Sequence, residues 1–311
     1  MKFAGWVLAQ GLAALLLLTG CTTPQISALD AQWPADLPNQ VLLTQVPFFA
    51  QNDYECGPAA LAMALQSTGV TIAPSALVDQ VFVPTKKGAL QVEMLAATRR
   101  QGVLAYPLEP RMEAIVREVH AGHPVVVFQN LSLPVYPVWH YAVVIGFDRN
   151  RNVLTMHTGT SAAAEISLYA FERTWARGNY WAMVALRPPA LPATAQPGAL
   201  ALAIAALERS HADAALVAYN AGLAQWPEHR GLLFGAGNAA YASGDLLQAH
   251  ARYATLVKNH PDFADAWNNL AQLLAEHGEW DAAAQAVAKA VALGGPRLAS
   301  YQALQTQIQN H

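Results

Sequence analysis

Charged side chains and cysteines are scarce in this sequence. Only 13% of the 311 residues are charged, the formal net charge is -3, and there are two cysteines. Two cysteines exclude a disulfide-rich scaffold, and the lack of excess positive charge argues against nucleic acid as the main partner. A hydrophobic content of 54% excludes a disordered chain. With no P-loop, dinucleotide fingerprint, HExxH or paired CxxC motif, we expect no cofactor and no metal.

The first 20 residues have the composition of a signal peptide. Lys2 is followed by an apolar run that extends to Leu18. The run ends in Leu18-Thr19-Gly20-Cys21, which resembles the lipobox at which bacterial signal peptidases cut before a lipid-modified cysteine. Residues 1–20 are therefore predicted to be a lipoprotein signal peptide, with Cys21 as the lipidation site. An uncleaved anchor or an ordinary signal peptide is the alternative.

The residue after Cys21 bears on the destination of the protein. Thr22 is not an aspartate, which resembles the outer-membrane sorting signal of Gram-negative lipoproteins. The expected location is the outer membrane, with a lipid anchor and the protein facing the periplasm. Prolines and weak periodicity then predict a tether over residues 21–40.

Residues 41–187 mix helical and strand patterns. Helices are expected first, at 58–68, 91–101 and 112–121, and again at 169–177. Strands are expected at 124–129, 140–147, 153–157 and 181–187. The continuous apolar run Val125–Phe128 is typical of a central strand that is buried on both faces. This order predicts an α+β domain.

The remainder of the chain contains a repeat. Residues 188–198 are rich in proline and are predicted to be a linker. In residues 199–311, Pro227 and Pro261 lie 34 residues apart, and alanines and aromatics recur with the same spacing. This pattern resembles the tetratricopeptide repeat, an all-α architecture, and the tail from Pro296 would be its capping helix. A plain alanine-rich helical bundle is the alternative.

A cysteine stands at the predicted start of the first helix of the α+β domain. In Cys56-Gly57-Pro58, proline suits the first turn of a helix and glycine allows a tight entry. The N-terminal dipole of that helix is expected to stabilise a thiolate. Gln51, five residues upstream, is placed to aim its amide at a developing oxyanion.

A histidine begins the expected strand over residues 140–147. A neutral imidazole at His140 could accept the thiol proton and later protonate a leaving group. Cys56, His140 and Gln51 are therefore the candidate catalytic residues. An inert core cysteine and an ordinary strand histidine are the structural alternatives.

These two segments resemble the C39-like cysteine peptidases. The resemblance is carried by Gln51…Cys56-Gly-Pro-Ala-Ala and by His140-Tyr-x-Val-Val-x-Gly, and it covers roughly residues 41–187. It implies a papain-like fold, with Cys56 as nucleophile, His140 as base and Gln51 as oxyanion donor. The family's best-known members are the bacteriocin-processing domains.

The chain departs from the family pattern at the third catalytic residue. The family usually places an Asp or Asn about 16 residues after the histidine, on the next strand. Here that region reads Val153–Thr160, without a carboxylate or carboxamide at the matching place. His157, Thr158 or a backbone carbonyl could orient His140 instead, so His157 is a possible orienting residue.

Three functions are compatible with these features. The main expectation is a lipid-anchored periplasmic cysteine peptidase, which cleaves a peptide or amide bond through a thioester. Its partners would be a peptide or protein substrate, a protein on the repeats, and the membrane through the lipid. A non-catalytic adaptor that binds envelope proteins is the second possibility, and acyl or amide transfer by the same residues is the third.

Overall fold

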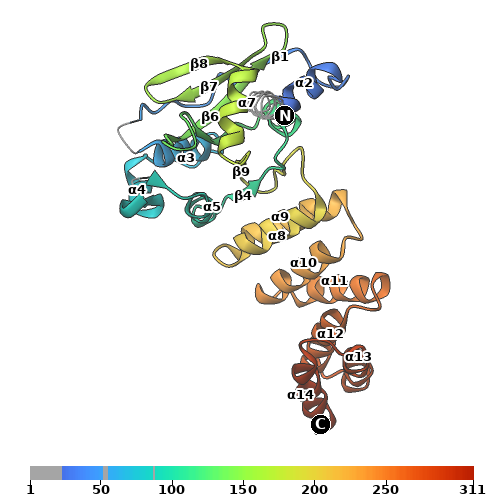
Figure 1. Ribbon diagram of the computed structural model, residues 1–311. Coiled ribbons are helices and arrows are strands. Elements are labelled where there is room, and N and C mark those ends of the chain that lie inside the picture. Colours follow the sequence, from blue (N-terminus) through green and yellow to red (C-terminus); the bar gives the residue numbers. More distant parts are fainter. Residues whose placement is uncertain (1–22, 52–54, 87) are drawn as a thin grey trace, which may run out of the picture. The chain divides into compact units, whose positions relative to one another are not determined.

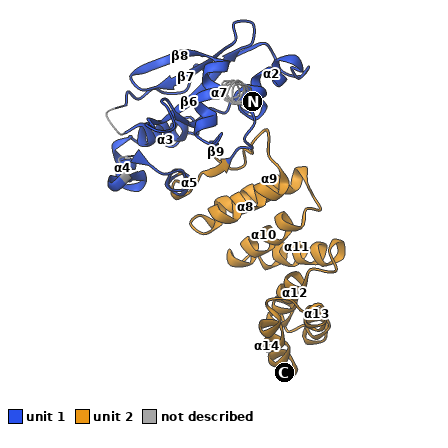
Figure 2. Ribbon diagram, in the orientation of Figure 1, with its two compact units in different colours: residues 1–97, 107–185 blue, residues 98–106, 186–311 orange. Residues whose placement is uncertain are grey.

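The computed structural model describes residues 23–51, 55–86 and 88–311, with Lys86 described by its backbone alone. The chain divides into two compact units (Figure 2). Unit 1 comprises the residues up to Ala97 together with 107–185, and unit 2 comprises residues 98–106 and 186–311. Within the described ranges, no helix is both long enough and apolar enough to cross a membrane.

A largely antiparallel sheet forms the centre of unit 1 (Figure 1). Within unit 1 its order is β9-β5-β6-β7-β8, and β1 pairs with β6. The central strand β5 lies between β9 and β6, and its Val125, Val126 and Val127 are fully buried, as the apolar run predicted. The strands are β1 (Gln40–Leu42), β4 (Leu104–Pro107), β5 (Val125–Asn130), β6 (Trp139–Asp148), β7 (Val153–Thr158), β8 (Ser161–Ser167) and β9 (Ala182–Leu186).

Helices and a small hairpin complete the α+β domain. Helix α3 (Cys56–Gln66) is buried from Gly57 to Leu65, because a segment of Ala, Leu and Met is apolar on every side. It packs against β6 and against a two-stranded hairpin. The remaining elements are α4 (Ser75–Val81), β2 (Phe82–Val83), the 3-10 helix η2 (Pro84–Lys86), β3 (Gly88–Ala89), α5 (Gln91–Arg100), α6 (Met112–His120) and α7 (Leu168–Arg177).

The segment expected to be a tether is in part folded onto unit 1. It contains helix α2 (Pro24–Ala31), whose Ile26 and Leu29 are buried. The buried carboxylate of Glu172 on α7 accepts the backbone N–H of Gln25 at 3.0 Å and of Ile26 at 2.7 Å. Free N–H groups and the positive dipole end of a helix favour such a carboxylate. Helix α2 therefore packs on unit 1 through two buried apolar side chains and through the hydrogen bonds of its first turn to Glu172.

Unit 2 contains the expected helical array. Its helices are α8 (Pro197–Glu208), α9 (Ala212–Gln225), α10 (Arg230–Ala242), α11 (Leu246–Asn259), α12 (Ala264–Glu276), α13 (Trp280–Leu293) and α14 (Leu298–Gln309). Aromatic rings of α9 and α11 pack directly on glycines of α10. A Cβ added at Gly235 would overlap the ring of Tyr219, and one at Gly237 would lie 2.5 Å from Cε1 of Tyr253. Small residues therefore set the spacing between successive helices, as the sequence pattern predicted.

Candidate active site

Cys56 is the first residue of helix α3. The helix starts there because Pro58 lacks a backbone N–H and Ala59 donates its own to the carbonyl of Glu55 at 3.1 Å. Gly57 has a different reason: a Cβ at this position would overlap Cβ of Ala89 in β3. The Gly-Pro pair thus brings the helix start against the small hairpin and fixes the position of the cysteine.

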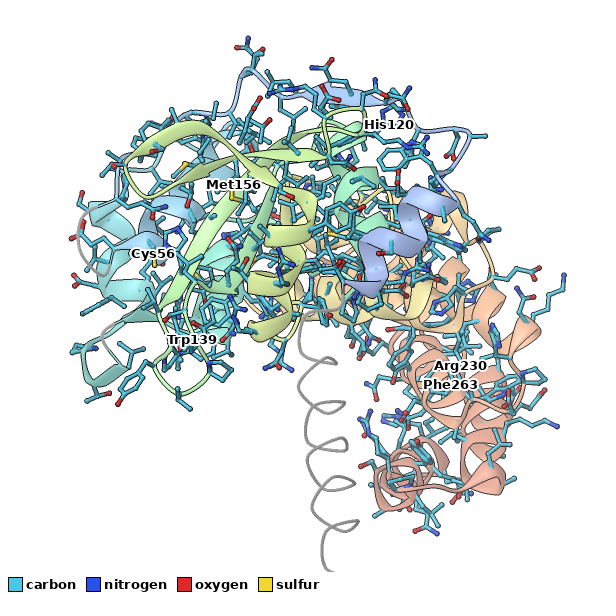
Figure 3. All side chains as sticks on the ribbon, turned by 45° about the horizontal axis from the view of Figure 1, so that its top comes forward. Cys56, His120, Trp139, Met156, Arg230 and Phe263 are labelled. Atoms are coloured by element: carbon cyan, nitrogen blue, oxygen red, sulfur yellow. The ribbon has the colours of Figure 1, made fainter. Side chains whose placement is uncertain are left out.

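The Cys56 thiol is stabilised in its protonated form. Burial raises its pKa, while the backbone N–H groups of Tyr141, Gly57 and Cys56 itself act in the opposite direction. The expected effect of the helix N-terminus is therefore present, but the loss of hydration outweighs it. The contact with the Tyr141 backbone also places the sulfur against β6, one residue from His140. Figure 3 shows Cys56 on the side of unit 1 that also carries Trp139.

His140 lies near the start of β6, with its imidazole half-buried. Its Nε2 is 2.7 Å from Oγ1 of Thr158, at the end of β7. Burial lowers the pKa of His140, which favours the neutral ring. A neutral ring that carries its proton on Nε2 donates to Thr158 and leaves Nδ1 free to accept a proton.

His157 bonds to other groups. Its Nδ1 accepts the backbone N–H of Ala163 at 3.1 Å, so its Nε2 carries the proton and donates to the carbonyl of Val46 at 3.2 Å. The side chain is buried and packs on Phe48. Of the orienting groups considered from the sequence, Thr158 is the one that bonds to His140, while His157 ties β7 to the segment before the active site.

Gln51 is held next to β6 by three hydrogen bonds to Gly159 and Tyr141. Its backbone N–H donates to the carbonyl of Gly159 at 3.0 Å, and its Oε1 accepts the N–H of Gly159 at 3.1 Å. That acceptor role fixes the amide orientation, so Nε2 points to the carbonyl of Tyr141 at 3.4 Å. This last bond is long, and the donor is therefore available to a stronger acceptor.

Tyr141 connects these groups and was not singled out from the sequence. Its backbone meets both the Cys56 sulfur and the Gln51 amide, and its hydroxyl donates to the carbonyl of Ala89 at 3.2 Å. Burial, and then the charge of a Cys56 thiolate, raises the pKa of the phenol, so it stays a donor. Its position directly after His140 is the one signal that could have identified it.

Two further expectations concern sites of other kinds. Cys21, the predicted lipidation site, lies outside the described residues. Among the described residues, no cluster of His, Cys, Asp or Glu has the arrangement of a metal site. The roles of Cys56, His140 and Gln51 stay predictions, although α3, β6 and the Gln51 segment place them around one residue.

Comparison with known proteins identifies both parts of the chain. Residues 43–183 match the model of the Peptidase_C39 like family. Residues 200–247 and 234–297 match a model of the tetratricopeptide repeat. The chain combines a C39-like peptidase domain with tetratricopeptide repeats. This confirms the family resemblance and the fold class that the sequence predicted.

Several solved structures are similar to one part of the chain. A Bacillus anthracis protein described as a C39-like peptidase is 20% identical over 48% of this chain and 98% of its own, with a TM-score of 0.41. The peptidase domain of Streptococcus ComA is 18% identical over 46% and 98%, with a TM-score of 0.38. The TPR2B domain of yeast Sti1 is 15% identical over 37% and 94%, with a TM-score of 0.34. The comparison with curated proteins found no match.

Proposed function

We propose that this protein is a lipid-anchored periplasmic cysteine peptidase with a protein-binding repeat domain. The observation that carries the peptidase proposal is the convergence on β6: Cys56 begins helix α3, which packs on β6, and the Gln51 amide bonds to Tyr141 of β6, next to His140. A nucleophile, a base and an oxyanion donor are the groups that acyl transfer requires. The C39-like family model over residues 43–183 supports the same chemistry.

The proposed reaction starts from a neutral thiol and a neutral imidazole. As the Cys56 sulfur attacks the scissile carbonyl carbon, Nδ1 of His140 takes the thiol proton, and Nε2 keeps its bond to Thr158. The carbonyl oxygen becomes an oxyanion, which the Gln51 amide and the Cys56 N–H stabilise. Collapse breaks the C–N bond, and the amine leaves with the proton from His140. A thioester remains on Cys56.

Water completes the cycle by the same route in reverse. His140 removes a proton from water, whose oxygen attacks the thioester carbon, and the C–S bond breaks. The sulfur leaves as a thiolate and regains the proton from His140. Attack by an amine or alcohol in place of water would give acyl transfer with the same residues.

Covalent labelling of the chain from Thr22 tests this proposal. This chain contains all described residues, and Cys56 is its one cysteine. We expect a peptidyl vinyl sulfone to label wild type at Cys56 and a peptide library to be cleaved. Cys56→Ala should abolish both, His140→Ala should slow both, and Gln51→Ala should cost roughly 10²–10³ in rate. Cleavage that survives Cys56→Ala would overturn the proposal.

The proposal for the repeats rests on a cavity of about 330 Å³ in unit 2. Asparagines dominate its polar wall, and Oδ1 of Asn268 is buried without a hydrogen-bond partner. Such a wall offers donors and acceptors to the main chain of a peptide. The lining residues are Phe234, Asn238, Tyr241, Tyr253, Asn268, Asn269, Gln272 and Arg297. Binding of peptides from an array should weaken in Asn238→Ala and stay unchanged in the exposed control Leu247→Ser.

The anchor proposal rests on the sequence Leu18-Thr19-Gly20-Cys21 and on Thr22. It places the protein at the periplasmic face of the outer membrane of a Gram-negative bacterium. Metabolic labelling with a fatty acid should mark wild type and not Cys21→Ser, which should accumulate as a precursor. Equal label in both proteins would reject the anchor and leave the peptidase proposal untouched.

A non-catalytic adaptor is the alternative function. Two observations favour it: β7 offers His140 a hydroxyl rather than a carboxylate, and burial raises the pKa of the Cys56 thiol. An adaptor should bind its peptide equally well with Cys56→Ala. It should also react with the vinyl sulfone no faster than a free cysteine does.

A further inference from the structure

The loop between β5 and β6 displays apolar side chains to solvent. Leu133, Val135 and Tyr136 are 63%, 75% and 79% exposed, and Leu131, Val138 and Trp139 are about half exposed. We call residues 131–139 the apolar hairpin. No Asp, Glu, Lys or Arg occurs from residue 124 to residue 147. Several large apolar side chains exposed together in one loop are typical of a surface that contacts a partner, a ligand or a membrane.

Four backbone N–H groups of the apolar hairpin are bonded locally, within the hairpin or to Asn130 at its base. Oδ1 of Asn130 accepts the N–H groups of Ser132 at 3.0 Å and Val138 at 2.9 Å. The N–H of Leu131 donates to the carbonyl of Val138 at 2.9 Å, and that of Tyr136 donates to Leu133 at 3.1 Å. A peptide ligand would need such groups to be free, whereas hydrocarbon requires them to be bonded internally.

The hairpin is also rigid at its base. The ring of Trp139 stacks on Phe128 of β5, with centroids 5.1 Å apart, and two prolines at positions 134 and 137 restrict the loop. The loop is therefore held in its conformation by contacts within the domain, before any partner binds. Docking of a preorganised loop costs little ordering entropy.

Helix α7 connects the hairpin to the point where the described chain begins. Glu172 holds the first turn of α2, and Arg177 donates from Nε to the carbonyl of Asn130 at 3.1 Å. These two residues of α7 are about 7.5 Å apart along the helix axis. The first turn of α2 and the base of the apolar hairpin are therefore both bonded to helix α7. The exposed Arg173, one turn before Arg177, adds a positive charge suited to anionic headgroups.

We propose that the apolar hairpin inserts into the interfacial region of a lipid bilayer. Leucine and valine side chains would enter the acyl boundary, and Tyr136 and Trp139 would lie at headgroup level, where these residue types are enriched. This contact is separate from a lipid on Cys21 and from catalysis, and does not rest on either. His140 directly follows Trp139, so insertion holds the active site at the membrane surface.

Vesicle flotation of the unlipidated chain from Thr22 tests the proposal. The probe is vesicles of phosphatidylethanolamine and phosphatidylglycerol. We expect wild type to float with them and the variant L133S/V135S/Y136S to bind at least about tenfold more weakly. The matched control L202S/L247S changes two leucines of unit 2 that are 75% and 83% exposed, and it should bind as wild type does.

A fluorophore on the hairpin provides a second measurement. In a Cys56→Ala background, an environment-sensitive dye on Val135→Cys should shift to the blue with vesicles, and the same dye on Leu247→Cys should not. Wild type that stays with the vesicle-free fraction, or an equal loss of binding in both serine variants, would overturn the proposal. If L133S/V135S/Y136S keeps vesicle binding but loses vinyl sulfone labelling without vesicles, the hairpin binds substrate instead, and the proposal is wrong.

Discussion

Nε2 of His140 lies 2.7 Å from Oγ1 of Thr158, so a hydroxyl stands where the family pattern places a carboxylate or carboxamide. A hydroxyl accepts the ring N–H and fixes the tautomer, but it carries no charge to stabilise an imidazolium. This partner and the lowered pKa of His140 both favour a neutral imidazole.

Thr158→Val should slow labelling of Cys56 by the vinyl sulfone. Loss of one hydrogen bond, worth about 0.5–1.5 kcal/mol, corresponds to roughly a twofold to tenfold loss of rate. Thr158→Ser retains the hydroxyl and should restore the rate, and Thr158→Asn offers the ring a carbonyl and should do the same. The measurement is the second-order labelling rate at fixed pH.

His157→Gln is the comparison for that series. Because His157 bonds to Val46 and Ala163 inside the domain, its loss should lower the free energy of unfolding in urea by about 1–3 kcal/mol. The labelling rate should stay within about twofold of wild type. A rate loss in His157→Gln with no effect in Thr158→Val would reverse the assignment.

The pH dependence should be that of a neutral pair. Burial raises the pKa of Cys56 above its ordinary value of 9.0 and lowers the pKa of His140 below 6.5. Alkylation by iodoacetamide should therefore rise continuously from pH 7 through pH 9, without the acidic plateau of a thiolate–imidazolium pair. Peptide cleavage should fall only below about pH 6.5, where His140 becomes protonated.

The same shifts set the sign of the stability change with pH. The lowered pKa of His140 contributes stability that is present above 6.5 and is lost as the pH falls through the folded-state value. The raised pKa of Cys56 contributes stability that is present below 9.0 and is lost as the pH rises. Urea unfolding across this pH range should show that His140→Ala lacks the loss of stability at acid pH. Cys56→Ala should lack the loss of stability at alkaline pH.

Glu172→Ala should release helix α2 from unit 1. The substitution removes the two carboxylate oxygens that accept the N–H groups of Gln25 and Ile26. We therefore expect a loss of about 1–3 kcal/mol in the free energy of unfolding and faster amide exchange over residues 24–31. Glu165→Gln is the control, since its pair with Arg151 is exposed and should change stability by less than about 0.5 kcal/mol. Unchanged exchange in α2 would show that Glu172 does not hold it.

Gly57→Ala should disturb the start of α3. The new methyl group overlaps Ala89 in β3, and we expect a destabilisation of about 1–3 kcal/mol together with slower labelling of the adjacent Cys56. Gly198→Ala is the matched change at the start of α8, where a Cβ meets nothing within 4 Å. That variant should be neutral or more stable by up to about 1 kcal/mol. Equal stability of the two variants would contradict the steric argument.

Elements with strong local signals were predictable from the sequence. The helix expected at 91–101 is α5 at Gln91–Arg100, and the strand expected at 124–129 is β5 at Val125–Asn130. The repeats were predictable because each unit contacts only its neighbours, so the pattern recurs along the chain. Strand β8 was not expected: its residues are mostly small and polar, and pairing with β7 makes them a strand.

The candidate site was predictable in its residue types and not in its connections. Cys56 and His140 follow from local motifs, but the choice between His157 and Thr158 depends on which face of β7 each occupies. The register of β7 shifts against β6 between Val144 and Gly146, and against β8 between Met156 and Thr158. Because of these shifts, the alternation of side chains along β7 does not predict which residue of β7 lies on the same face of the sheet as His140. The docking of α2 was hidden for a similar reason, since its cap, Glu172, lies 146 residues from Ile26 in sequence.

Two of the three glycines of α10, Gly235 and Gly237, have a consequence for the repeat array as a whole. Gly235 receives Tyr219 from the preceding helix, and Gly237 receives Tyr253 from the following one, on opposite sides of the same helix. Helix α10 thus packs against both the preceding helix and the following one, and so couples the stability of neighbouring repeats. A methyl group at Gly235 would weaken the packing of α9 on α10, and one at Gly237 would weaken the packing of α11, so each change acts on one neighbour of α10 only.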